Sequence, residues 1–263
     1  MFLVLLRLKE NNDYMSEVEN QRMAGMESPF ARTELLLGAA AMERLARSRV
    51  AVFGIGGVGG YVVEALARSG VGALDLIDDD TVSVSNINRQ IYALHSTIGR
   101  AKVDVAAERV RDINPACRVT THRMFYLPEN ADQIDMSQFD YVVDSLDTIT
   151  AKMEIARRCL RLGVTHICSM GAAYKMDPMA FRVADFDATR IDPLARMLRK
   201  LLHREGIHHF KCVYSEEEPK WNPEVPVYVD GKKQPGSNAF VPAAAGLLIA
   251  REVIVDLTGG VTD

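Results

Sequence analysis

The stretch from 49 to 80, RVAVFGIGGVGGYVVEALARSGVGALDLIDDD, constrains the fold more than any other part of the chain. Short apolar runs at 50–53 and 74–77 flank a glycine cluster and a helix-like segment. Glycines at such a turn permit positive φ and close approach of the backbone to a ligand, so that the N–H groups of the next helix can face a phosphate. The pattern predicts a strand, a turn, a helix and a strand around a nucleotide. It leaves NAD, FAD and ATP open, and a glycine turn that only packs a helix on a sheet has the same pattern.

Strand and helix patterns continue to alternate after this unit. Apolar runs predict strands at 117–121, 139–143 and 165–169, and helices are expected at 102–113 and 150–162. This order predicts an α/β fold with a Rossmann-like, doubly wound, mostly parallel sheet. Two more predicted strands, at 181–183 and 211–214, flank an amphipathic helix and are expected to form an antiparallel C-terminal extension.

The composition is that of a chain with one substantial core. Of its 263 residues, 48% are hydrophobic, and the formal net charge is -4. This charge gives no global basic field for nucleic acid, although a local basic patch is compatible with it. We predict a mobile N-terminal extension over 1–28 and a single domain over 29–263. Within that domain, 29–175 is expected to bind the nucleotide and 176–263 to serve the substrate or a dimer contact.

The cysteines and the apolar segments bear on the cellular compartment. Cys117, Cys159, Cys168 and Cys212 are widely spaced and include no C-x-x-C pair. This spacing argues against a thiolate zinc site and a disulfide framework, and it favours a reducing, cytoplasmic compartment. The N-terminal apolar run lacks the flanks of a signal peptide, and the run at 239–250 is too short to cross a bilayer. No membrane association is expected.

Polar side chains gather after the second strand of the glycine unit, where ligands bind in open α/β sheets. Asn86, Asn88, Arg89 and Gln90 form this cluster. Asn86 and Asn88 are equally well explained as caps of a turn. Arg89 is harder to explain in that way, because the isoleucines on either side indicate a segment that is partly packed down. Lys102 opens a predicted helix, where its charge opposes the helix dipole, and this small penalty favours a functional role.

Three further charged groups have both a structural and a functional explanation. Asp144 and Asp147 end a predicted strand, where they either cap the next helix or hold Mg²⁺ beside a triphosphate. Arg32, in a helical lead-in to the first strand, is either a surface charge or a phosphate clamp. The amphipathic helix at 192–205 is either a solvated face or a nucleic-acid contact; its basic residues are Arg196, Arg199, Lys200, His203 and Arg204.

From Arg32 to Gly171 the chain resembles the ubiquitin-activating-enzyme-like superfamily, whose smaller bacterial members include ThiF, MoeB and HesA. The resemblance is carried by GIGGVGG, LIDDDTVSVSNINRQ, GRAKVD, INP and VVDSLDT, in the expected order and spacing. The second half, with SMGAAYKMDP, CVYSEEEP and GSNAFVPAAAG, looks like the tRNA threonylcarbamoyladenosine dehydratase group of that superfamily.

The resemblance implies an ATP site and assigns residues to it. Asp78 would hold the ribose hydroxyls, Asp147 would position Mg²⁺, and Arg32 would reach the γ-phosphate of the neighbouring subunit's ATP, which implies a homodimer. A monovalent cation at the loop 170–174 and an accessory protein are further expectations that the sequence leaves open. The phosphates would be lined by Gly54, Gly56, Gly57 and Gly59 and gripped by Asn86, Arg89 and Lys102.

The implied reaction is the ATP-dependent cyclisation of N6-threonylcarbamoyladenosine in tRNA. Its carboxylate would be adenylated, and a neighbouring group of the same side chain would displace AMP with net loss of water. No enzyme thiol is needed, and Cys212 has an ordinary explanation as a small strand residue. The alternative is adenylation of the C-terminal carboxylate of a ubiquitin-like or sulfur-carrier protein, although the zinc pairs common in those relatives are absent. The glycine loop alone also permits an NAD- or FAD-dependent oxidoreductase or a nucleotide sensor, but neither requires Arg89, Lys102 and Asp147.

Overall fold

A computed structural model of the chain describes residues 28–220, 228–229, 232–233 and 235–260. It divides into two compact units, Met1–Glu43 and Arg44–Asp263. In the first unit, α2 (Ala31–Leu37) ends at Gly38, which has a φ of +82°. The next helix, α3 (Ala39–Arg47), begins in the first unit, and its residues from 44 onward belong to the second. The helical lead-in to the first strand that the sequence predicts is therefore confirmed, and Gly38 divides it into two short helices. The predicted mobility of 1–28 falls almost entirely on residues outside the described ranges.

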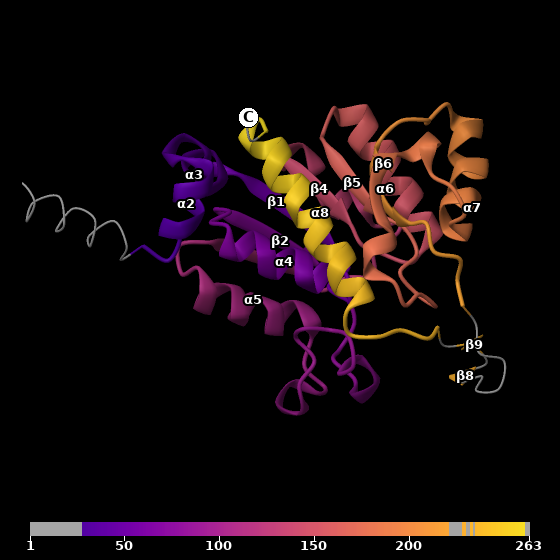
Figure 1. The fold of residues 1–263 in the computed structure, drawn as a ribbon, viewed down its shortest axis with the longest axis horizontal. Coiled ribbons are helices and arrows are strands. Elements are labelled where there is room, and N and C mark those ends of the chain that lie inside the picture. Colours follow the sequence, from indigo (N-terminus) through magenta and orange to yellow (C-terminus); the bar gives the residue numbers. More distant parts are fainter. Residues whose placement is uncertain (1–27, 221–227, 230–231, 234, 261–263) are drawn as a thin grey trace, which may run out of the picture. The chain divides into compact units, whose positions relative to one another are not determined.

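The second unit is built on a seven-stranded sheet (Figure 1). Its order is β3-β2-β1-β4-β5-β7-β6, and every neighbouring pair is parallel except β6 and β7. The predicted doubly wound, mostly parallel sheet with an antiparallel C-terminal side is thus confirmed. The strands are β1 (Arg49–Phe53), β2 (Ala73–Ile77), β3 (Arg118–His122), β4 (Tyr141–Asp144), β5 (His166–Ser169), β6 (Phe181–Asp185) and β7 (Lys211–Ser215).

Helices cover both faces of this sheet, which explains why the central strands are almost continuously apolar. The helices α4 (Gly59–Arg68), α5 (Lys102–Ile113) and α8 (Val241–Thr258) pack together on one face. The other face carries α6 (Ile149–Leu162) and α7 (Pro193–Leu202). Short helices connect these elements: η1 (Val84–Asn86), η2 (His95–Thr97), η3 (Ala131–Gln133), η4 (Met136–Gln138), η5 (Pro178–Ala180), η6 (Phe186–Ala188) and η7 (His203–Glu205). Two short strands, β8 (Tyr228–Val229) and β9 (Lys232–Lys233), form a separate antiparallel pair.

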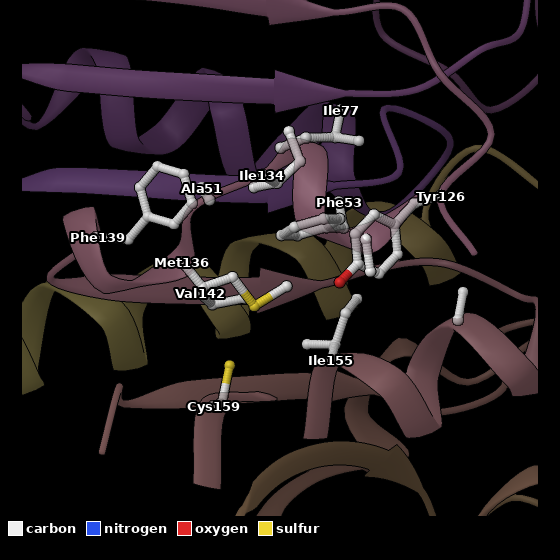
Figure 2. Packing of buried hydrophobic residues seen from close by; sticks show 12 residues of the cluster. Ala51, Phe53, Ile77, Tyr126, Ile134, Met136, Phe139, Val142, Ile155 and Cys159 are labelled. Carbon is white, nitrogen blue, oxygen red and sulfur yellow. The ribbon is translucent and has the colours of Figure 1, made fainter. Parts of the chain in front are cut away.

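The core beneath the central strands fixes the carboxyl ends of β1 and β4. Figure 2 shows Phe53 against Tyr126, with ring centroids 4.8 Å apart in an edge arrangement, and Ile155 of α6 close to them. All three side chains are buried. Burial of a large aliphatic or aromatic side chain contributes about 1.5–3 kcal/mol. The last residue of β1 is therefore held firmly at the point where the glycine loop begins.

Candidate functional site

The glycine loop leaves the sheet where the order of connections reverses. β1 pairs with β2 on one side and with β4 on the other, and the last residues of β1 and β4, Phe53 and Asp144, are register partners. The next residues are Gly54, with a φ of +85°, and Ser145. A Cβ on Gly54 would lie 2.8 Å from the carbonyl oxygen of Ser145, so only glycine fits there. Ligands of doubly wound sheets bind at such a switch point.

The turn leaves no room for a side chain at Gly59 and little at Gly57. A Cβ on Gly59 would lie 1.8 Å from the carbonyl oxygen of Gly54, and one on Gly57 would lie 3.3 Å from Cβ of Pro242 at the start of α8. Within the described chain, the backbone amides of Gly57, Val58 and Gly59 donate to no protein acceptor. No side chain caps the first turn of α4, and no acid occupies it. This bare helix N-terminus presents amides and a positive dipole end to an anion.

Asp78 connects this loop to the end of β2. Its Oδ2 accepts the amide of Ile55 at 2.6 Å, and its Oδ1 accepts the amide of Asp80 at 2.9 Å. Burial raises the pKa of Asp78, and this effect outweighs the opposing attraction of the Lys102 ammonium and the two amide bonds. Each carboxylate oxygen retains a lone pair after these bonds, so Asp78 can still accept a hydroxyl group.

Lys102 lies at the same end of the sheet, at the start of α5. Its ammonium is 2.6 Å from Oδ2 of Asp80, and the lysine side chain is 6% exposed whereas that of Asp80 is 64% exposed. Among the described residues, the hydrogen-bond partner of this buried ammonium is the exposed Asp80, so an incoming anion can replace or share that partner. One carboxylate oxygen from each of Asp78, Asp79 and Asp80 lies within 4.8 Å of those of the other two.

The polar segment after β2 combines structural and unassigned groups. Asn86 is buried, and its side-chain oxygen accepts the amide of Ser83 at 3.1 Å, so the structural explanation holds for that atom. Asn88 donates to the carbonyl of Ser237 at 3.1 Å. These bonds leave the amide nitrogen of Asn86 available to a ligand.

Arg89 differs from these asparagines because no acidic side chain of the described residues pairs with it. Its guanidinium donates to the carbonyl of Ser85 at 2.7 Å and to Oδ1 of Asn88 at 3.0 Å. Burial lowers its pKa. Its Cγ is 3.6 Å from the position that a Cβ on Gly57 would occupy. A partly desolvated cation beside unpaired loop amides is therefore suited to a phosphate.

The two aspartates at the carboxyl end of β4 differ in their surroundings. Asp147 is exposed, and the N-cap of α6 is Thr148, so the capping explanation of Asp147 does not hold. Asp144 is 1% exposed, and its Oδ1 is 3.0 Å from the ammonium of Lys152 and accepts the amide of Leu146 at 3.1 Å. Asp144 is thus committed to the protein, whereas the exposed Asp147 accepts a 3.4 Å hydrogen bond from the Thr148 hydroxyl and can still contact a metal.

Sequence reasoning missed Lys152. Its ammonium also donates to the carbonyl of Ser169 at 2.8 Å and contacts the sulfur of Cys168 at 3.4 Å. Burial disfavours the ammonium, but Asp144 and Cys168 together outweigh this effect and raise the pKa of Lys152. The only sequence signal was a lysine within the apolar face of α6, close behind an aspartate that ends a strand.

The remaining predicted residues lie elsewhere. Arg32 is exposed on α2, in the first unit, and so is not part of the geometry described for the second. On α7 and η7, Arg196, Lys200 and Arg204 are exposed, whereas Arg199 donates to Oγ1 of Thr189. Cys212 is fully buried, and burial raises its pKa to about 12, which is unsuitable for a thiolate nucleophile.

The topological switch point, the uncapped helix N-terminus and the adjacent aspartate and cations define a nucleotide-binding protein with a doubly wound sheet. The chain belongs to the ThiF family, whose model matches residues 30–261. This confirms the family predicted from the sequence motifs.

Two relatives and two solved structures are informative. The chain is 43% identical to the tRNA threonylcarbamoyladenosine dehydratase of Bacillus subtilis over 87% of this chain and 94% of that protein. The Escherichia coli protein of the same name is 40% identical over 72% and 73% of the two chains. Crystal structures of the Escherichia coli dehydratase TcdA with AMP and with ATP match 88% of this chain with a TM-score of 0.80, at 36% and 35% identity. They cover 94% and 93% of those chains.

Proposed function

We propose that this protein uses ATP to cyclise N6-threonylcarbamoyladenosine in tRNA. The observation that carries the proposal is Arg89, a partly buried guanidinium that has no carboxylate partner among the described residues and lies beside the unpaired amides of the glycine loop. The dehydratase relatives, one of which has been solved with ATP, give the nucleotide and the substrate class.

The proposed nucleotide contacts follow the chemistry of the site. Asp78 accepts a ribose hydroxyl. The triphosphate is bound by Asn86, Arg89 and Lys102, and the Lys102 ammonium exchanges its contact with Asp80 for one with a phosphate. Gly54 and Gly59 shape the loop, and the amides from Gly56 to Gly59, including that of Gly57, point to the phosphates. Three neutral or cationic donors are needed because the attacking carboxylate and the triphosphate repel each other.

In the proposed reaction, the substrate carboxylate forms a bond to the α-phosphorus and pyrophosphate leaves. A neighbouring group of the same side chain then attacks the activated carbonyl, a ring closes and AMP departs. The sum is loss of one water from the nucleoside, with ATP converted to AMP and pyrophosphate. No thiol is required, in keeping with four cysteines that are all buried and free.

The proposal extends to a metal and to a second subunit. Asp147, exposed and not used as a cap, suits Mg²⁺, which would screen phosphate charge. Arg32 is proposed to reach the ATP of a neighbouring subunit in a homodimer, and the exposed Leu35 and Leu36 on the same helix favour such a contact. We also infer a reducing, cytoplasmic location from the free cysteines. A monovalent cation and an accessory protein stay predictions.

None of the described helices combines the length and the apolar composition that a membrane crossing requires.

The test is nucleoside mass spectrometry after incubation of the purified protein with ATP, Mg²⁺ and tRNA that carries threonylcarbamoyladenosine. We expect a product lighter by one water, and a loss of about 100-fold or more in the Lys102→Ala variant. Arg111→Ala, at the exposed end of the same helix, is the matched control and should retain activity. Absence of product with the wild-type chain would overturn the proposal. Pyrophosphate exchange that depends on a carrier protein, and not on tRNA, would replace it with the alternative.

A further inference from the structure

A cluster of histidines and aspartates lies at the β6 end of the sheet, four strands away from the β1 loop in the sheet order. Asp187 is in η6, His203 begins η7, and His208 lies between η7 and β7. Figure 1 shows α7, which η7 continues, at this end of the sheet. The proposed function uses none of these residues.

The three side chains converge on one point. Nε2 of His203 is 2.6 Å from Oδ1 of Asp187, and Nδ1 of His208 is 3.6 Å from Oδ2 of the same carboxylate. One nitrogen or oxygen from each residue lies within 4.8 Å of those of the others. The side chains of Asp187, His203 and His208 are 34%, 36% and 43% exposed, so an ion can reach them from solvent.

The residues around the cluster hold it in place. The ring of Phe186, which is fully buried, stacks on that of Phe210 at 4.3 Å and meets that of His203 edge-on at 6.3 Å. Asp185 accepts the amide of Asp187 at 3.0 Å and contacts Nδ1 of His209 at 3.2 Å. The segments before α7 and before β7 are thereby packed together, which holds the three side chains close to one another.

From this convergence we propose that Asp187, His203 and His208 form a binding site for a divalent transition metal, of which Zn²⁺ is the representative. Two imidazoles and one carboxylate are the donors that Zn²⁺ and its neighbours prefer, and Mg²⁺ and Ca²⁺ prefer oxygen alone. Three protein ligand atoms about 2.0–2.2 Å from a tetrahedral ion would fill three of its four positions and leave the fourth open to water or to a ligand. The bound metal links η6, η7 and the segment before β7, so it fastens α7 to the β6–β7 pair.

A competing explanation is an ion-pair network on the surface. An isolated exposed pair of this kind contributes at most about 1 kcal/mol, and it is insensitive to transition metals. The two explanations therefore differ in whether Zn²⁺ binds to these three residues and stabilises the fold.

The experiment is calorimetric titration of the untagged full chain with ZnCl₂ after treatment with EDTA, together with thermal unfolding with and without the metal. We expect one Zn²⁺ per chain, a higher Tm in its presence, and visible absorption when Co²⁺ replaces it. His203→Gln/His208→Gln should weaken binding by more than about 10–100-fold, which is the loss seen even for outer-shell partners. His95→Gln, an exposed histidine outside the cluster, is the matched control and should bind as the wild type does.

The double variant is compared with Asp187→Asn and with His208→Gln alone, and circular dichroism checks that each variant folds. Zn²⁺ binding that survives in the folded variants, or binding to the wild type no tighter than that of Mg²⁺, would overturn the proposal. Neither outcome bears on the nucleotide site.

Discussion

The backbone amide of Ile55 donates a 2.6 Å hydrogen bond to Oδ2 of Asp78 and thereby ties the glycine loop to the end of β2. The other carboxylate oxygen accepts the amide of Asp80. One buried side chain thus fixes two loops that border the same site. Its two acceptor oxygens are essential to this role, because each amide takes one of them.

Replacement of Asp78 by asparagine should loosen the glycine loop. The amide side chain offers one acceptor oxygen, so either Ile55 or Asp80 would face an NH₂ group. An unsatisfied buried donor costs about 1–3 kcal/mol, and we expect the free energy of unfolding to fall by that amount and ATP binding to weaken at least about tenfold. Urea unfolding and calorimetric titration with ATP measure both effects. Asp79→Asn, at the exposed neighbouring position, should leave them unchanged; equal losses in the two variants would contradict the role of Asp78.

Arg89→Ala should separate activity from stability. The guanidinium has no ion-pair partner among the described residues and donates hydrogen bonds to Ser85 and Asn88, so its removal should lower the free energy of unfolding by no more than about 0.5–1.5 kcal/mol. Loss of a group that stabilises developing phosphate charge should lower kcat by about 100- to 1,000-fold. Pyrophosphate release and thermal unfolding are the measurements. Arg161→Ala, exposed at the end of α6, is the control, and full activity of Arg89→Ala would exclude Arg89 from the site.

Much of the fold could be predicted because its determinants are local. Apolar runs with intervening helices define the parallel sheet, and the positive φ of Gly54 and the close approach at Gly59 follow from residues near one another in the chain. The polar residues after the strands were predictable as a group, since parallel strands bring their carboxyl ends to one edge.

Contacts between distant segments could not be predicted in the same way. Lys152 matters because α6 brings it between the ends of β4 and β5, where Asp144 and Ser169 meet it. The cluster of Asp187, His203 and His208 is formed by the approach of η6, η7 and the segment before β7, whereas the sequence pattern places His203 on a basic helix face. Asn86 was ambiguous from sequence, and only the structure shows that its oxygen is used by Ser83.

Lys152→Met should destabilise the fold strongly, because it leaves the charge of Asp144 buried without a partner. Breaking a buried ion pair from one side costs about 3–5 kcal/mol, and urea unfolding should show a loss of this size. The double variant Lys152→Met/Asp144→Asn should recover part of it, since no buried charge remains and the amide of Leu146 keeps an acceptor. Lys200→Met, at an exposed position, should cost little. A double variant as unstable as Lys152→Met would show that the buried charge is not the cause.

His166 should make the stability of the protein depend on pH. It is buried in β5, its Nε2 has no hydrogen-bond partner among the described residues, and burial lowers its pKa from 6.5 to about 4. The folded state therefore binds its proton less readily than the unfolded state, so stability is lost as the pH falls from about 6.5 towards 4. At about 1.4 kcal/mol per pH unit, the full loss over this window is about 3 kcal/mol.

His166→Phe removes this titration and preserves an aromatic ring opposite Phe210, whose centroid is 4.9 Å away. We expect the variant to lose less stability than the wild type between pH 7 and pH 5, in urea unfolding at each pH. Carboxylates with lowered pKa values, such as Asp75, lose their contribution at lower pH and do so in both proteins. His95→Gln should follow the wild-type curve, because that side chain is exposed. Parallel curves for wild type and His166→Phe would show that a different group causes the loss in acid.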